Sequence, residues 1–187
     1  GALLQYAHLT QGNTLPHVDS VQVVQSGQFL VLDAATRQNL EISQTLRGEA
    51  APTLLSALDV CACHMGSRLL RRWLHHPLRN LADISTRQQA VASLLQARLY
   101  ADLHAHLGKV VDVERIHARI ALQSARPRDL SGLRDTLAQL PHLVQHLAHQ
   151  TDGLLGILAD ALQSPPDLLA LLQAAILPEP ASVVRDG

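Results

Sequence analysis

The hydrophobic positions of this chain recur mainly at spacings of three and four, the pattern of helices packed on a core. The clearest example alternates these two steps through Leu130, Leu133, Leu137, Leu140, Val144 and Leu147. This pattern predicts a helix with a continuous apolar seam, kinked at Pro141 because proline donates no backbone hydrogen bond. Two interpretations remain open: the seam is the core stripe of a bundle helix, or it binds a partner helix.

Similar but shorter patterns predict helices along most of the chain. We expect them over residues 2–8, 34–42, 81–107, 113–123, 153–163 and 167–177, with two more inside 54–78 separated by a break at 61–64. Asp33 and Asp112 can cap the helices that follow them, Pro77 stops one helix, and Gly108 ends another. Two β-prone runs, 21–24 and 29–32, lie on either side of Ser26-Gly27 and predict a hairpin.

The predicted fold class is mainly α, a helical bundle with a small N-terminal β-hairpin. We assign residues 1–32 to an N-terminal helix and hairpin junction, 33–177 to the bundle, and 178–187 to a tail. Hydrophobic residues make up 47% of the 187 residues and aromatic ones only 2%, so a core of Leu, Val, Ile and Ala is expected. The chain starts in an apolar run and has no helix stop at its end, which suggests a piece of a longer polypeptide.

The net charge of −1 predicts weak binding of nucleic acid by this chain alone. Cys61 and Cys63 are too few and too close for a disulfide framework, and no signal peptide or long apolar run is present. A soluble, cytoplasmic protein is therefore expected.

Two clusters could in principle bind a metal. On a helix, His142, His146 and His149 would share one face, but no glutamate accompanies them as a general base, so a surface face is favoured over a metalloenzyme site. Cys61, Cys63 and His64 lack the distant second ligand pair of a structural zinc site. We interpret these cysteines as small, half-buried residues at a helix start.

The basic residues are read as structural rather than as a phosphate surface. Arg68, Arg71, Arg72 and Arg79 form the densest cluster, but no aromatic residues are interleaved, so a solvated or ion-paired helix face is favoured. Farther along, four arginines lie close in sequence to acidic residues and are expected to form ion pairs that fix helix orientation. The set consists of Arg115, Arg119, Arg126 and Arg128 near Asp112, Glu114 and Asp129.

Three segments, in this order, carry a family resemblance: DAATRQNLEI from Asp33, LLSALDVCACHMGSRLLRRWLHHPL from Leu54, and DVERIHARIALQSARPRDLSGLRDTL from Asp112. Together they resemble the core domain III of MutS DNA mismatch-repair proteins. The residues that carry this resemblance, expected to be structural, are Asp33, Arg37, Asn39, Asp59, Met65, Gly66, Arg68, Trp73, Pro77, Asp112, Glu114, Arg115, Arg119, Arg126, Pro127 and Asp129. The family tends to have threonine around the positions of Cys61 and Cys63, which argues against a family-wide metal role there.

The resemblance implies a mechanical role: a core or lever domain that relays changes between the DNA clamp and the ATPase domain of its parent protein. Its implied partners are the remaining parental domains and, through the full-length protein, mismatched double-stranded DNA and MutL; the parent would be a homodimer. ATP and magnesium would bind only in the parental ATPase domain, since this chain has neither a G-x-x-x-x-G-K-[ST] loop nor the family's Phe-x-Glu motif. We therefore expect no catalytic, cofactor or metal residues here, no ATP turnover and no preference for mismatched DNA. The alternative is a free-standing helical adaptor that binds a partner helix along the 130–147 seam.

Overall fold

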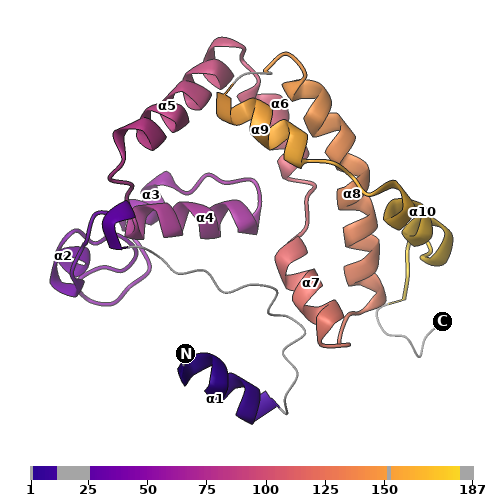
Figure 1. The fold of residues 1–187 in the computed structure, drawn as a ribbon, viewed down its shortest axis with the longest axis horizontal. Helices are drawn as coiled ribbons and strands as arrows, with labels where there is room; N and C mark the ends of the chain where they lie inside the picture. Colours follow the sequence, from indigo (N-terminus) through magenta and orange to yellow (C-terminus); the bar gives the residue numbers. More distant parts are fainter. Residues whose placement is uncertain (1, 12–25, 151–152, 182–187) are drawn as a thin grey trace.

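The computed structural model describes residues 2–11, 26–150 and 153–181, and this part of the chain is mainly helical (Figure 1). The helices in these ranges are α1 (Ala2–Gln11), α2 (Ala34–Asn39), α3 (Leu54–Leu58), α4 (His64–His75), α5 (Leu81–Gln96), α6 (Tyr100–Leu107), α7 (Val113–Ala121), α8 (Pro127–Leu147), α9 (Gly153–Ala161) and α10 (Pro166–Ala175), with one 3-10 turn, η1 (Ser26–Gln28). The predicted mainly α class is confirmed.

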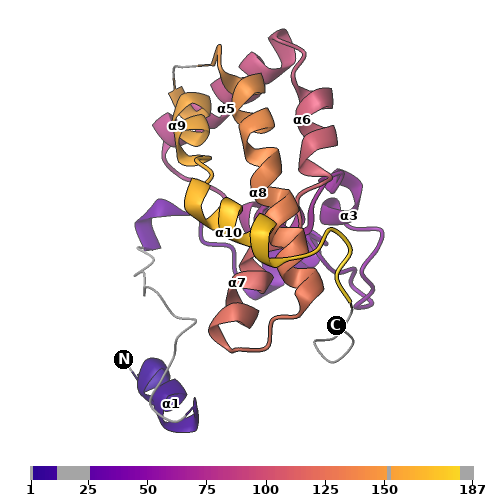
Figure 2. The same ribbon diagram turned by 90° about the vertical axis from the view of Figure 1, so that its right-hand side faces the viewer.

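The helices from α2 onward form two groups. We call α2 to α4 the N-terminal group and α5 to α10 the C-terminal group. Helix α8 packs against α6, α7, α9 and α10, and α5 packs against α9, whereas α3 packs against α4. Figure 1 shows α7 and α10 on opposite sides of α8, and Figure 2 shows α10 crossing α8. Within the described residues, no helix of one group packs extensively against a helix of the other.

The main hydrophobic core lies inside the C-terminal group. Its buried members are Ile116 from α7, Leu133 and Leu137 from α8, and Leu172 from α10. Burying a side chain of this kind contributes about 1.5–3 kcal/mol. The partly buried residues packed around them are Val111, Val113, Leu130, Leu140, Leu169 and Ile176. Within the described chain, this cluster takes no member from the N-terminal group.

The seam of α8 is a core stripe. Leu133, Leu137 and Leu147 are buried, and Leu130 and Leu140 pack against the core cluster. The chain's own helices therefore cover the seam that the adaptor interpretation assigned to a partner. Pro141 lies inside α8, and the helix continues past it to Leu147.

One of the predicted helices forms two separate helices in the structure. The predicted run over 81–107 divides into α5 and α6 because the chain turns sharply after Gln96. Arg98 has a φ of 55°, and the amides of Arg98 and Leu99 donate to the carbonyls of Leu95 and Leu94. These two bonds are the Schellman motif that closes a helix end.

The same motif shortens two other predicted helices. In α2 the amides of Glu41 and Ile42 donate to Gln38 and Arg37, and α2 ends at Asn39 rather than at 42. After α7 the amides of Gln123 and Ser124 donate to Ile120 and Arg119. Glu41 and Gln123 take φ values of 47° and 53°, which most residues other than glycine avoid. Helix ends of this kind carry no glycine signal in the sequence.

The hairpin remains a prediction, because its first run, 21–24, lies outside the described residues. In the second run, Phe29 forms an isolated antiparallel bridge with Leu78, and residues 30–32 are not assigned to a strand. The amide of Leu30 donates to the Pro77 carbonyl, and that of Arg79 donates to Gln28. This segment therefore packs along the loop between α4 and α5.

No single helix in the described ranges has the length and apolar character needed to cross a membrane. Helices α9 and α10 meet that test only when taken together, and they are bent by 47° at the break between them.

Candidate functional site: an ion-paired junction between two helical groups

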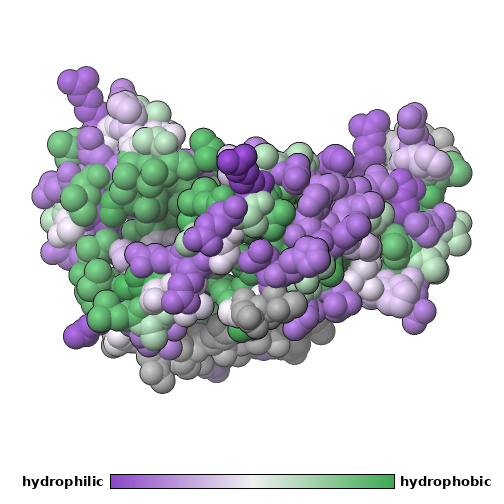
Figure 3. Space-filling view, turned by 90° about the horizontal axis from the view of Figure 1, so that it is seen from above, coloured by the Kyte–Doolittle hydropathy of each residue, from purple (hydrophilic) through white to green (hydrophobic). Residues whose placement is uncertain are grey.

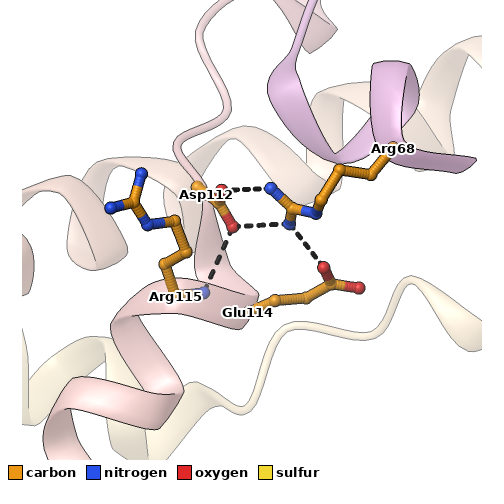
Figure 4. A network of polar contacts seen from close by, with 4 residues as sticks. All are labelled: Arg68, Asp112, Glu114 and Arg115. Carbon is orange, nitrogen blue, oxygen red and sulfur yellow. Dashed lines mark hydrogen bonds and ion pairs between the residues drawn. The ribbon is translucent and has the colours of Figure 1, made fainter. Parts of the chain in front are cut away.

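The junction between the two groups is centred on Arg68 of α4. Its guanidinium donates from Nη1 to Asp112 Oδ2 at 2.5 Å and from Nη2 to Asp112 Oδ1 at 2.8 Å. The same Nη2 also donates to Glu114 Oε2 at 2.5 Å. Figure 4 shows the two carboxylates converging on one guanidinium. This fork geometry is specific to arginine, since lysine cannot form two parallel bonds to one carboxylate.

The local sequence after residue 111 places both carboxylates at the start of α7. Asp112 is the N-cap, and its Oδ1 accepts from the Arg115 amide at 3.1 Å. Glu114 lies in the first turn. Negative charge is favourable at a helix N-terminus, where amide groups lack helical partners. The Asp-x-Glu spacing thus stabilises α7 and also presents two acceptors to Arg68.

Arg68 changes the protonation equilibrium of its partner. The guanidinium, together with the Arg115 amide, lowers the pKa of Asp112 despite partial burial. Conversely, the two carboxylates raise the pKa of Arg68. The ion pair is therefore fully charged at neutral pH. The side chain of Asp112 is 14% exposed and that of Arg68 is 45% exposed, so water partly screens the pair.

Other polar contacts join the two groups beside this ion pair. His104 of α6 lies 3.0 Å through Nε2 from the backbone oxygen of Val60. Arg87 of α5 stacks over the ring of Trp73 of α4, 4.0 Å from its centroid. A cavity of about 350 Å³ separates the segment around Asp59 from the segment around Gly108. The boundary between the groups is therefore polar and incompletely filled.

The break before α4 is shaped by Asp59 and Gly66. Asp59 accepts from the Ser67 hydroxyl at 2.9 Å and from the Cys61 amide at 3.2 Å, and these bonds lower its pKa. At Gly66 an added Cβ would lie 3.2 Å from the Cβ of Cys61, so glycine allows the close approach of the preceding loop. Cys63 is half-buried as predicted, whereas Cys61 is exposed. Partial desolvation and the nearby Asp59 still raise the pKa of the Cys61 thiol, which makes it a weak nucleophile. This geometry fits a structural turn.

A second ion pair fixes α7 against α8. Arg119 donates to Asp129 at 2.6 Å, and the other oxygen of Asp129 accepts from the Arg126 amide at 2.9 Å. Asp129 is thus held at the start of α8 beside Pro127, which occupies the first turn. Four arginines were expected to form ion pairs in this region. The described structure shows an ion pair for Arg119 but no ion pair for Arg115, Arg126 or Arg128.

Among the described contacts, the remaining residues of the resemblance form no hydrogen bond or ion pair with Arg68. Asp33 caps α2 by accepting from the Thr36 amide at 2.6 Å, while Arg37 and Asn39 lie near the end of that helix. Met65 is half-buried on α4, and Pro77 follows its C-cap. The structure therefore brings Arg68, Asp112 and Glu114 together and leaves the α2 residues as a separate set.

Sequence reasoning missed Arg134 and His75. The Nη1 atom of Arg134 donates to the carbonyls of Ile176 and Leu177, both at 2.9 Å, which ties the end of α10 to α8. His75 Nε2 lies 2.9 Å from the Ser43 hydroxyl, and burial together with nearby arginines lowers its pKa. Both contacts join positions more than thirty residues apart, and no local pattern signals them.

Of the three histidines predicted to share a helix face, His142 and His146 lie on α8, whereas His149 lies in the turn after α8 ends at Leu147. The two histidines on α8 contact another histidine. The ring of His106 on α6 lies 5.6 Å from that of His142 and 5.0 Å from that of His146, measured between centroids. His106 Nδ1 also lies 3.2 Å from Gln139 Oε1. Across the part of the chain that the structure describes, no three histidine, cysteine or acidic side chains are placed to hold a metal ion.

The family model of MutS domain III matches residues 35–187. This match covers most of the chain, including both helical groups and the Arg68 junction, and the chain therefore belongs to the MutS domain III family. MutS domain III is the core domain of DNA mismatch-repair proteins and is non-catalytic by itself.

Proposed function

We propose that this domain is a mechanical relay, which passes conformational change between the mismatched-DNA clamp and the ATPase domain of a MutS-family protein. The observation that carries the proposal is the Arg68 junction. A core-packed C-terminal group meets the N-terminal group through Arg68, Asp112 and Glu114 rather than through shared core residues. Polar, partly hydrated contacts can break and re-form as two bodies shift, whereas an interdigitated core resists such sliding.

In this proposal the domain itself binds no cofactor. ATP and magnesium bind in the ATPase domain of the parent protein. The parent protein in this proposal is a cytoplasmic homodimer. Mismatched double-stranded DNA and MutL are partners of the full-length protein. The residues named above position helices and do not take part in chemistry.

The proposal is tested by Arg68→Gln in the intact mismatch-repair protein that contains this domain. The variant removes the charge and the bidentate fork, and both carboxylates remain at the start of α7, exposed to water. We expect mismatch binding and basal ATP turnover to be retained, while the change in ATP turnover caused by mismatched DNA falls several-fold. Arg72→Gln is the matched control, because Arg72 is exposed on the same helix and the described structure shows no ion pair for it.

Unchanged coupling in Arg68→Gln would refute the relay through this junction. Equal loss of coupling in Arg72→Gln would also refute it, because the effect would then follow the charge of α4 and not the contact with α7.

A further inference from the structure

A second polar feature lies on the other side of Asp112, between α7 and α8. A cavity of about 180 Å³ is lined by the guanidinium-bearing residues Arg115, Arg119 and Arg128, by Asp112 and Asp129, and by apolar atoms around Ile116. The cavity is open to solvent on one side, and it would hold several water molecules or one small ion.

Both carboxylates in this lining already have partners. Asp112 accepts from Arg68 through both oxygens and from the Arg115 amide. Asp129 accepts from Arg119 and from the Arg126 amide. The acidic side chains of the cavity are therefore engaged at its edges and oriented by other donors.

Two arginines remain available. Within the described residues, neither Arg115 nor Arg128 has a carboxylate within ion-pair distance. Figure 4 shows the Arg115 guanidinium on the opposite side of Asp112 from Arg68. Arg115 comes from α7 and Arg128 from the first turn of α8. Two arginines of the cavity lining, on two different helices, thus have no ion-pair partner among the described residues.

We propose that this cavity binds a phosphate group, either as free phosphate or as a terminal phosphate monoester. A phosphate monoester carries several acceptor oxygens and up to two negative charges, so it can bridge guanidinium groups on both helices. The small volume favours a terminal phosphate over the internal diesters of a duplex, and the chain's net charge of −1 offers no wider basic surface. Binding there would tie α7 to α8 beside the Arg119–Asp129 pair. This inference stands apart from the relay and does not require it.

The test is calorimetric titration of the chain with inorganic phosphate, using sodium chloride at the same ionic strength as the reference. We expect saturable binding in the millimolar range. Arg115→Gln and Arg128→Gln should each weaken it about tenfold or more, since each removes a charged hydrogen-bond donor. Arg79→Gln is the control: it makes the same charge change at an exposed side chain outside the cavity. Circular dichroism establishes that each variant is folded.

A second titration distinguishes the two sources of phosphate, using a short duplex with a 5′-phosphate and the same duplex with a 5′-hydroxyl. Binding that requires the 5′-phosphate and both arginines assigns the site to polynucleotide ends, whereas arginine-dependent binding of inorganic phosphate alone assigns it to the free ion. Absence of binding by every phosphate probe would overturn the proposal. Binding that survives in both arginine variants would overturn it equally.

Discussion

At the scale of single residues, Arg68 connects two parts of the chain that share little packing. Its partners, Asp112 and Glu114, are more than forty positions away in sequence. Sequence patterns placed Arg68 on a solvated or ion-paired face of its helix, and the structure confirms the ion-paired alternative. The sequence patterns could not identify the ion-pair partner of Arg68. Helical periodicity defines which face of a helix is polar, but it does not show which other helix lies opposite that face.

The strength of this ion pair can be measured by a double-mutant cycle of Arg68→Gln and Asp112→Asn. Asparagine caps a helix about as well as aspartate, so Asp112→Asn removes the charge and leaves the start of α7 intact. We expect a coupling free energy of about 1 kcal/mol, at the upper end for partly exposed pairs because the contact is bidentate. Denaturant unfolding of the four chains measures it. A coupling indistinguishable from zero would show that the pair contributes nothing to stability.

The pH dependence of the same pair follows from the lowered pKa of Asp112. A carboxyl whose pKa is lower in the folded chain than in the unfolded chain stabilises the folded state at pH values above its unfolded pKa, about 3.9. This contribution disappears as the pH falls through the folded pKa. We expect the stability difference between the parent chain and Asp112→Asn to be constant from neutral pH to mildly acid pH. It should then shrink below about pH 3.9. A difference that grew on acidification would contradict the assignment of charge.

At the scale of elements, the starts of capped helices were predicted correctly from the sequence, whereas several helix ends were not. Helices with a side-chain cap at their start, such as α2 after Asp33 and α7 after Asp112, begin where the sequence predicted. The ends at Glu41, Arg98 and Gln123 were missed because the left-handed residue of each Schellman motif is a long polar residue and not glycine. The two local backbone hydrogen bonds of the motif accompany this conformation, although the propensity of these side chains disfavours it.

Substitution by glycine should have opposite effects at two nearby positions. Arg98→Gly relieves the positive φ at the end of α5 and should stabilise the chain by up to about 1 kcal/mol. Gln96→Gly, at the last position of α5, should destabilise it by up to about 1 kcal/mol because glycine is a poor helix former. Thermal unfolding of both variants makes the comparison. Destabilisation by Arg98→Gly would show that the arginine side chain contributes more than the strained backbone costs.

At the scale of the whole molecule, the chain combines one well-packed body with a less tightly attached one. The core of Ile116, Leu133, Leu137 and Leu172 was predictable as helical stripes, and the α8 seam proved to be part of it. Its division from α2–α4 was not predictable, because periodicity says nothing about which helices share a core. Figure 3 shows hydrophobic residues gathered toward the left of the face that it draws. Exposed apolar side chains of α5 and α9 include Leu95 and Ile157.

The most direct test of this two-body account is native-state hydrogen exchange of the chain at increasing denaturant. If the Arg68 junction joins two separable bodies, amides of α4 should exchange through an opening of lower free energy than amides in the middle of α8, near Leu133 and Leu137. Arg68→Gln should lower the opening free energy of α4 further and leave that of the middle of α8 nearly unchanged. A single opening free energy shared by α4 and α8, lowered equally by Arg68→Gln, would contradict the account and show that the domain unfolds as one body.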